Sequence, residues 1–158
     1  MAAGTSKTLV VDSSVIVKWV NREGEQDMKQ ADSLLDDWES GRVSLAAPEL
    51  AKYEVANALL YKKLDMPALR ASLTTVYALP IVYVNQTEDA AKEAAAIAKT
   101  QNITFYDATF IQAAKELNAS LVTANPKHQK SGGMVRVIGL KDYSSLLHPM
   151  GVRVSQIC

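Results

Sequence analysis

Short apolar runs alternate along the chain with longer segments in which apolar residues recur every three or four positions. Each run is rich in β-branched and aliphatic residues and is bounded by polar or turn-forming residues. Runs of this length and composition are typical of strands buried in a parallel sheet. The predicted strands lie near 8–11, 43–47, 80–84, 119–124 and 134–138.

The longer segments predict helices between these strands. They are expected from Ser13/Ser14 onward, at about 25–39, 49–63, 67–78 and 88–100, and from Thr104 onward. Pro48 is placed in the first turn of the third helix, because its missing N–H would be unpaired there anyway. Thr87 and Thr104 are the expected N-caps of the last two helices.

The alternation of strands and helices predicts the fold class. It indicates a three-layer α/β/α sandwich with a mainly parallel five-stranded sheet covered on both faces. No internal repeat or low-complexity linker interrupts the pattern, so we expect a single domain over 1–158. Within it, 1–6 are expected to form a flexible N-terminus and 149–158 a C-terminal tail.

Composition narrows the classes of function. The chain has 158 residues, with 17 acidic and 17 basic side chains, so it lacks the global basic field of an electrostatic nucleic-acid binder. Any nucleic acid must then be held by local patches. The single cysteine, Cys158, cannot form an internal disulfide, which favours a cytoplasmic location. No apolar stretch reaches the roughly 20 residues of a membrane span, so no membrane association is expected.

Four oxygen-bearing side chains stand at positions that the fold can bring together. Asp12 follows the apolar run LVV and Asn125 follows ASLVTA, so both lie where a strand ends. Glu54 lies on the helix ELAKYEVANAL, and Asp107 lies in the first turn of its helix. The crevice beyond the carboxyl ends of parallel strands is the usual ligand site of such sheets. Carboxylates gathered there favour a hard cation such as Mg²⁺ or Mn²⁺.

Each of these residues also has a purely structural interpretation. Asp12 precedes a helix and is as well suited to be an N-cap as to be a ligand. The helix dipole alone would stabilise Asp107. Glu54 lies beside a core-facing stripe and must be paired, protonated or bound to a metal. Their joint occurrence, with two members at strand ends, favours a common site.

The blocks VVDSSVIVKWV, PELAKYEVANAL and TFYDATFIQAAKELNASLVTANPKH resemble, in order and spacing, a PIN-domain ribonuclease of the VapC toxin type. The resemblance implies an acidic cluster that binds Mg²⁺ or Mn²⁺ and cleaves RNA endonucleolytically, leaving 5′-phosphate and 3′-hydroxyl ends. It assigns Asp12, Glu54 and Asp107 to the acidic positions. Ser14 and Thr123 fall on the small hydroxyl positions that support the site.

The fourth acidic position departs from the family pattern, because Asn125 stands where TAD is typical. An amide oxygen can ligate a metal or orient a water but brings no charge. We therefore expect at least one cation, held mainly by Asp12 and Asp107, with Glu54 and Asn125 acting directly or through water. A weaker hold on a second cation is expected.

The resemblance also implies partners. Such toxins commonly form homodimers and are silenced by a small antitoxin protein, whose C-terminal segment wraps the toxin. The apolar helix faces around Leu34, Leu35, Trp38, Leu59 and Leu60 are either a groove for that segment or simply core.

The segment after Asn125 carries Lys127, His128 and Lys130. It is either a local phosphate contact or a solvated charged loop.

The main alternative is a catalytically degenerate PIN domain that serves as an RNA-binding or protein-binding module. A phosphoaspartyl enzyme of the haloacid dehalogenase kind is disfavoured, because it needs a second aspartate where this chain has Ser14. The acidic pair and late lysine of a receiver domain are not found. A Gly-rich phosphate loop is also absent from the sequence, which argues against a nucleotide-dependent enzyme.

Overall fold

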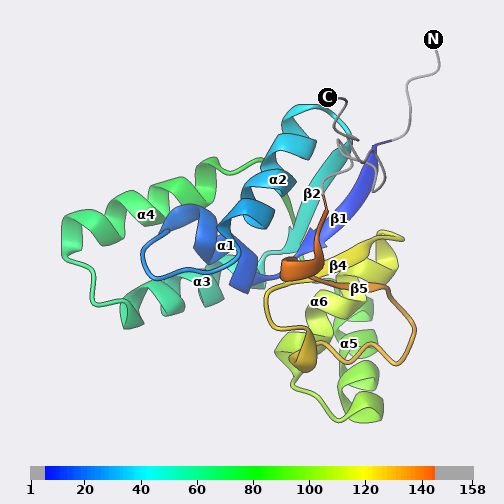
Figure 1. Ribbon diagram of the computed structural model, residues 1–158. Helices are drawn as coiled ribbons and strands as arrows, with labels where there is room; N and C mark the ends of the chain where they lie inside the picture. Colours follow the sequence, from blue (N-terminus) through cyan, green and yellow to red (C-terminus); the bar gives the residue numbers. More distant parts are fainter. Residues whose placement is uncertain (1–5, 145–158) are drawn as a thin grey trace, which may run out of the picture.

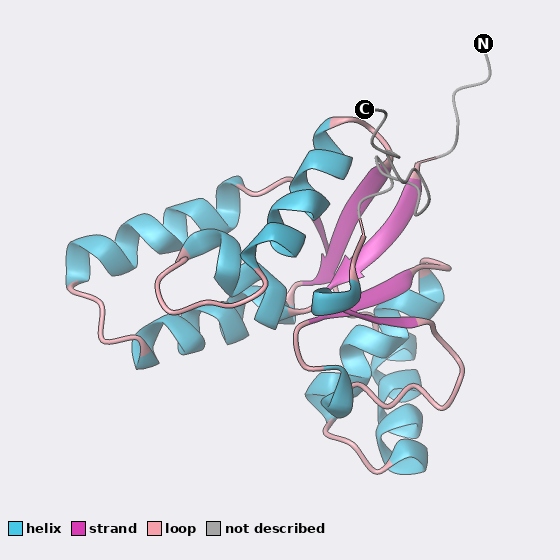
Figure 2. Ribbon diagram, viewed as in Figure 1, coloured by secondary structure: helices cyan, strands magenta, loops and turns pink. Residues whose placement is uncertain are grey.

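The computed structural model describes residues 6–144, in which helices cover both faces of a central sheet (Figure 1 and Figure 2). The strands are β1 (Lys7–Val11), β2 (Val43–Pro48), β3 (Ile81–Val84), β4 (Ser120–Thr123) and β5 (Val137–Gly139). The helices are α1 (Ser13–Val20), α2 (Met28–Glu39), α3 (Leu50–Tyr61), α4 (Met66–Ala78), α5 (Glu88–Gln101) and α6 (Phe105–Glu116), with 3-10 turns η1 (Pro126–His128) and η2 (Leu140–Asp142). The predicted α/β/α fold with a five-stranded parallel sheet is confirmed.

All strand pairs are parallel, in the order β3-β2-β1-β4-β5. β1 is therefore central, and Val11 at its end pairs with Val122 of β4. The chain continues from β1 to β2 on one side, whereas β4 lies on the other. This reversal places a crevice at the carboxyl ends of β1 and β4, where ligands bind in open α/β sheets.

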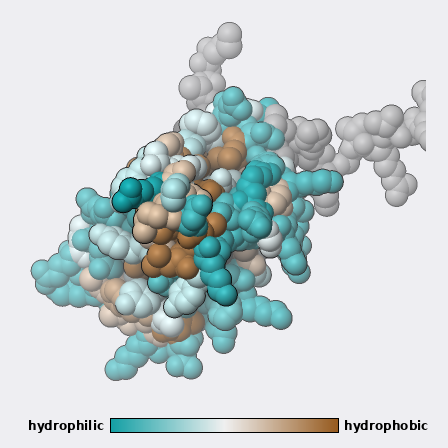
Figure 3. All heavy atoms as spheres, turned by 90° about the vertical axis from the view of Figure 1, so that its left-hand side faces the viewer, coloured by the Kyte–Doolittle hydropathy of each residue, from teal (hydrophilic) through white to brown (hydrophobic). Residues whose placement is uncertain are grey.

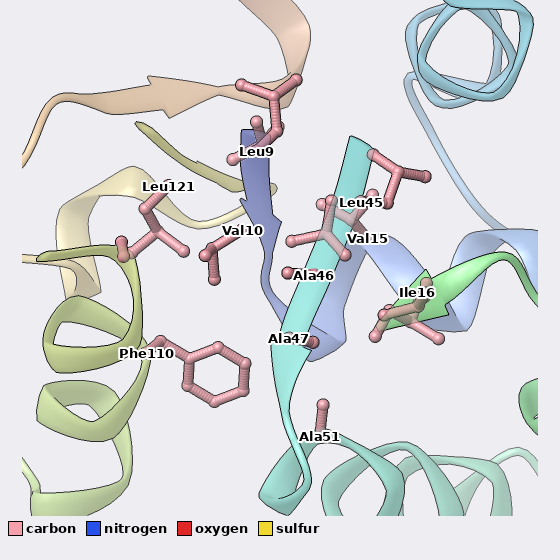
Figure 4. Close-up of a cluster of buried hydrophobic side chains, with 14 of the residues drawn as sticks. Leu9, Val10, Val15, Ile16, Leu45, Ala46, Ala47, Ala51, Phe110 and Leu121 are labelled. Atoms are coloured by element: carbon pink, nitrogen blue, oxygen red, sulfur yellow. The ribbon is translucent and has the colours of Figure 1, made fainter. Parts of the chain in front are cut away.

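The hydrophobic core lies on both faces of the central strands. Figure 4 shows Phe110 of α6 on one side of β1 and β2, with Val15 and Ile16 of α1 on the other. These three side chains and Val10 of β1 are at most 1% exposed. Because β1 is buried on both faces, the residue that follows it starts from a rigid position.

Helix α2 begins at Met28, three residues later than predicted. Asp27 has φ 56, a left-handed conformation that cannot continue a helix backwards. The preceding loop is held instead by Lys62, which follows α3 directly. Its Nζ donates to the carbonyl oxygens of Asn21 and Glu23 and to the carboxylate of Glu25. Residues 25–27 therefore belong to a tethered loop and not to the helix.

The prediction that Pro48 lies in the first turn of a helix is wrong. Pro48 is the last residue of β2 and pairs with Val84. It is tolerated there because the next ladder bond is donated by Glu49, whose N–H lies 2.9 Å from the Val84 oxygen. Strand β5 is likewise shorter than predicted, since 134–136 lead into it from a turn.

The helix caps agree with the prediction. The Thr87 hydroxyl accepts from the Ala90 N–H, and the Thr104 hydroxyl accepts from the Asp107 N–H. No helix within 6–144 is long and apolar enough to cross a membrane. Of the N-terminus expected to be flexible over 1–6, residues 1–5 lie outside the described residues, as does the predicted tail over 149–158 with Cys158. The assignment of all of 1–158 to one domain stays a prediction.

Candidate functional site

Asp12 follows β1 directly and is only 7% exposed. Its N–H donates to the Val122 oxygen at 2.9 Å, which continues the β1–β4 ladder by one residue. Its side chain makes no capping bond to α1. Instead its Oδ2 accepts from the hydroxyls of Thr123 at 2.6 Å and Ser14 at 2.8 Å. The N-cap interpretation of the side chain is therefore wrong, because the carboxylate faces the crevice between β1 and β4.

Both hydroxyls that hold Asp12 are fixed as donors by the backbone. The Ser14 oxygen accepts from the Ala124 N–H at 3.1 Å, and the Thr123 oxygen accepts from the Asn125 N–H at 3.0 Å. With an acceptor position of each oxygen already used, its proton points to the Asp12 carboxylate. The two supporting positions predicted from the sequence are thus brought into direct contact with Asp12.

Ser13 contacts two of the carboxylates, a role that was not predicted from the sequence. Its hydroxyl lies 2.6 Å from Oε2 of Glu54 and 3.2 Å from Oδ1 of Asp12. One hydroxyl therefore bridges the start of α1 and the middle of α3, with the shorter bond to Glu54. The Ser-Ser pair was visible in the sequence, but it was interpreted only as a helix start.

Asp107 lies in the first turn of α6 and is partly buried. The Thr104 hydroxyl accepts from its N–H at 3.0 Å and lies 2.8 Å from its Oδ2. This reciprocal arrangement caps the helix, so Asp107 has a structural role. Its other carboxylate oxygen has no hydrogen bond within the described part of the chain, and that oxygen is free to accept a ligand.

The three carboxylates influence one another electrostatically. Burial is the largest cause of the raised pKa of Glu54, and the negative charges of Asp12 and Asp107 raise it further. The hydrogen bond from Ser13 opposes this effect. No ion pair within 6–144 involves any of the three. The cluster therefore concentrates negative charge without a cationic side chain to balance it.

The donor chemistry suits a hydrated hard cation better than a closed protein cage. Among residues 6–144, no three carboxylate, imidazole or thiol side chains are close enough to enclose one ion together. Mg²⁺ is usually held by one or two carboxylates while it keeps several waters. Oxygen donors that are partly exposed and electrostatically unbalanced fit that mode of binding.

The sequence matches the family model "PIN domain" over residues 9–133. This chain belongs to the PIN domain family. The family predicted from the sequence blocks is therefore confirmed, and the match includes all four candidate positions. No curated protein matches the sequence.

Solved structures support the fold of this PIN domain. It is similar to a toxin–antitoxin complex from Klebsiella pneumoniae, with a TM-score of 0.62 and 17% identity over 84% of this chain and 97% of the other. It is also similar to VapBC2 from Rickettsia felis, bound to a promoter DNA fragment. The TM-score is 0.65 and the identity 12%, over 84% of this chain and 98% of the other. VapC20 of Mycobacterium tuberculosis, a sarcin-ricin loop cleaving toxin, is similar with a TM-score of 0.54 and 16% identity, over 73% of this chain and 87% of the other. At these identities the likeness concerns the fold.

Asn125 lies at the exposed rim of this PIN domain's crevice. Its backbone N–H contacts Thr123, whereas its side chain makes no hydrogen bond to any residue in 6–144. The side chain is thus free to turn toward the crevice or toward water. Lys127, His128 and Lys130 beyond it are exposed, which agrees with both the phosphate-contact and the solvated-loop interpretations.

Replacing Glu54 by glutamine is expected to stabilise the metal-free PIN domain at neutral pH. A carboxyl group whose pKa is raised by folding favours unfolding as pH rises from its usual value, 4.5, through the raised value. Glutamine removes that charge and can still accept from Ser13. In EDTA at pH 7, the variant should have a higher midpoint of thermal unfolding, and the difference should shrink toward pH 4.5.

The exposed loop residue Glu23 offers a matched control, because Glu23→Gln makes the same change away from the cluster. Equal unfolding midpoints for wild type and Glu54→Gln across this pH range would contradict the repulsion among the carboxylates.

Proposed function

We propose that this PIN domain is a divalent-metal-dependent endoribonuclease that hydrolyses RNA phosphodiester bonds, and that it is the toxin of a toxin–antitoxin pair. The observation that carries the proposal is the acidic cluster. Asp12, Glu54 and Asp107 lie at one crevice and have no cationic partner in the described chain. Burial raises the pKa of Glu54, and the charges of Asp12 and Asp107 raise it further. A structural cluster would be expected to contain its own counter-charge.

Asp12 and Asp107 would mainly hold a hydrated Mg²⁺ or Mn²⁺, and Glu54 and the neutral Asn125 would act directly or through its waters. When bound, the cation would supply acidification of water and stabilisation of the charge that develops on the phosphate oxygens. Ser14 and Thr123 fix the orientation of Asp12. Ser13 positions Glu54 through its 2.6 Å bond.

The charge of the cluster also makes RNA binding depend on the cation. Three carboxylates at one crevice repel a phosphodiester, and no basic side chain within 6–144 pairs with them to relieve this repulsion. RNA should therefore approach the cluster only after a cation is bound. The exposed Lys127 and Lys130 are proposed to assist this approach as local phosphate contacts.

The test is cleavage of a labelled RNA by the purified protein, after removal of metals by EDTA and re-addition of Mn²⁺ or Mg²⁺. Cleavage that stops in EDTA and returns with either cation supports the proposal. RNA binding without cleavage, under all of these conditions, would favour the alternative of a degenerate PIN domain that only binds RNA.

Replacing Asn125 by aspartate is expected to tighten Mn²⁺ binding, because it adds a charged ligand at the rim of the cluster. The exposed position and the free side chain allow the change without loss of a hydrogen bond. Titration calorimetry should give a lower Kd for the variant than for wild type. An equal or higher Kd would place Asn125 outside the metal site.

A protein partner is supported by apolar surface on the helical side away from α5 and α6. Figure 3 shows hydrophobic residues gathered in the middle of that face, with hydrophilic residues around them. Leu34 and Leu59, predicted as groove or core, are fully buried and belong to the core, whereas Trp38 and Leu60 are 41% and 63% exposed. Trp38 lines an apolar groove between α2 and the end of α4.

We infer that the partner is an antitoxin, because the names of two similar structures describe toxin–antitoxin complexes. The apolar groove that Trp38 lines is proposed as its binding site. A homodimer is proposed as the active assembly. Light scattering of the purified protein should give about twice the chain mass of 17.2 kDa, and a mass of one chain would contradict the homodimer. The cytoplasmic location expected from the cysteine content stays a prediction.

A further inference from the structure

A second groove, of about 290 Å³, lies beside the acidic cluster and has no role in the proposed metal site. Its walls come from the ends of β2 and β3, from the first turn of α3 and from the first three turns of α6. Three aromatic side chains line it: Tyr53, Phe105 and Tyr106. They are 70%, 39% and 60% exposed, so none of them is packed into the core.

The aromatic residues stand next to the carboxylates in the sequence and in the fold. Tyr53 precedes Glu54 on α3, and Tyr106 precedes Asp107 on α6. Successive residues of a helix point about 100° apart, so each tyrosine lies to the side of its neighbouring carboxylate. A strand of RNA with one phosphate at the cluster would therefore bring an adjacent nucleotide over this groove.

The polar residues of the groove suit a flat ligand with hydrogen-bonding edges. Asn85 and Gln86, at the end of β3, line the groove and are exposed. Their side chains make no hydrogen bond to the described residues. Thr109 and Gln112 are occupied, because they donate to the Phe105 oxygen and to Glu116. Aromatic walls with two free amides match the faces and edges of a nucleobase better than the aliphatic side chains of a protein partner.

The charge of the groove also favours a nucleobase as its ligand. Among the described residues that line it, Glu49 alone is charged, and Lys52 pairs with that carboxylate at 3.4 Å. A groove without free cations cannot gain its affinity from phosphate contacts. Binding there must come from contact with the bases themselves.

We propose that this groove is a base-binding subsite beside the acidic cluster, in which Tyr53 and Tyr106 stack on a nucleobase next to the cleaved phosphodiester. The inference rests on the proposed function, which puts the phosphate at the acidic cluster. Bases paired in a duplex have no free face to offer, so a duplex RNA would gain nothing from this groove.

The test uses a short, unpaired oligoribonucleotide that carries 2-aminopurine, a base whose fluorescence falls when it stacks on an aromatic ring. Fluorescence is recorded by stopped flow with Mn²⁺, before cleavage proceeds. Wild type and Tyr106→Phe should quench the signal. Tyr106→Ala and Tyr53→Ala should lose much of the quenching and raise the Kd roughly 5- to 150-fold, the range for one lost base–aromatic stack.

Tyr61 provides the matched control, since it is a 79% exposed tyrosine at the far end of α3. Tyr61→Ala should quench and bind as wild type does. Quenching and Kd unchanged in both groove alanine variants would overturn the inference, even if metal-dependent cleavage persists. If quenching depends on Tyr106 but the protein cleaves no RNA, base stacking in the groove is supported and the proposed nuclease activity is contradicted.

Self-association is the remaining outcome. If the alanine variants change from dimer to monomer in light scattering while they quench normally, the groove is a contact between two copies of the chain and the inference is wrong.

Discussion

Replacing Asp12 by asparagine is expected to lower metal-dependent RNA cleavage at least about 100-fold, the scale of losing one electrostatic contribution at an active site. Asp12 is the most buried of the three carboxylates and follows the central strand. Asparagine keeps the size of the side chain, and its oxygen can still accept from Ser14 and Thr123. The variant loses only the charge and one donor oxygen for the cation. Rates with Mn²⁺ in excess provide the measurement.

The Asp12→Asn variant should remain folded. Loss of the Asp12 charge removes one of the causes that raise the pKa of Glu54, so that pKa should fall toward its usual value. The exposed Asp36 of α2 gives a matched control, because Asp36→Asn makes the same change far from the crevice. Cleavage by Asp12→Asn at the rate of wild type would remove Asp12 from the active site.

Replacing Thr123 by valine is expected to impair both stability and cleavage. Thr123 is completely buried, and its hydroxyl donates to Asp12 and accepts from the Asn125 N–H. Valine has the same shape but cannot replace either bond. Leaving buried polar groups without partners should lower the free energy of unfolding by about 1–3 kcal/mol. The rate should fall about tenfold or more, because the Asp12 carboxylate loses its shortest hydrogen bond.

Thr74 of α4 gives the control. It is exposed, and its hydroxyl donates to the Arg70 carbonyl oxygen of its own helix, away from the crevice. Thr74→Val should therefore leave cleavage almost unchanged. Chemical denaturation measures the stability of both variants, and initial rates with Mn²⁺ measure cleavage. Equal rates for Thr123→Val and wild type would show that the hydroxyl does not position Asp12 for the reaction.

The sequence predicted the fold because each strand is a short aliphatic run with polar ends. It also located Asp12 and Thr123, since both lie at the ends of such runs. The contact between Asp12 and Thr123 depends on the strand order, which the pattern of apolar residues does not contain. β1 pairs with β4 as well as with β2, and the register places Val11 opposite Val122. Which strands become neighbours is decided by how the helices pack over the sheet.

The position of Pro48 and the start of α2 differ from the prediction for local reasons. Pro48 lacks an N–H and so fits a helix start or a strand end equally well, and only the pairing of β2 with β3 distinguishes the two. The start of α2 was predicted too early because residues 25–27 are all polar, and without an apolar period the helix boundary is not defined. Its actual path depends on Lys62, which is distant in the sequence.

The role of Ser13 at the site also depends on a residue that is distant in the sequence. A serine after a strand-end aspartate is a normal helix-start residue, and its bond to Glu54 joins positions 41 residues apart. The aromatic groove was missed because Tyr53 lies in an apolar stretch of the sequence that is typical of core, whereas it is 70% exposed. Exposure of a large side chain depends on which neighbours cover it, and the sequence does not specify that.

The most direct test of the metal site is calorimetric titration of Mn²⁺ into the metal-free wild type and the Asp12→Asn variant. The acidic cluster predicts saturable binding of at least one Mn²⁺ per chain to wild type, and binding to the variant that is much weaker or undetectable. Equal binding by the two proteins, or no binding to either, would contradict the claim that these carboxylates form a divalent-cation site.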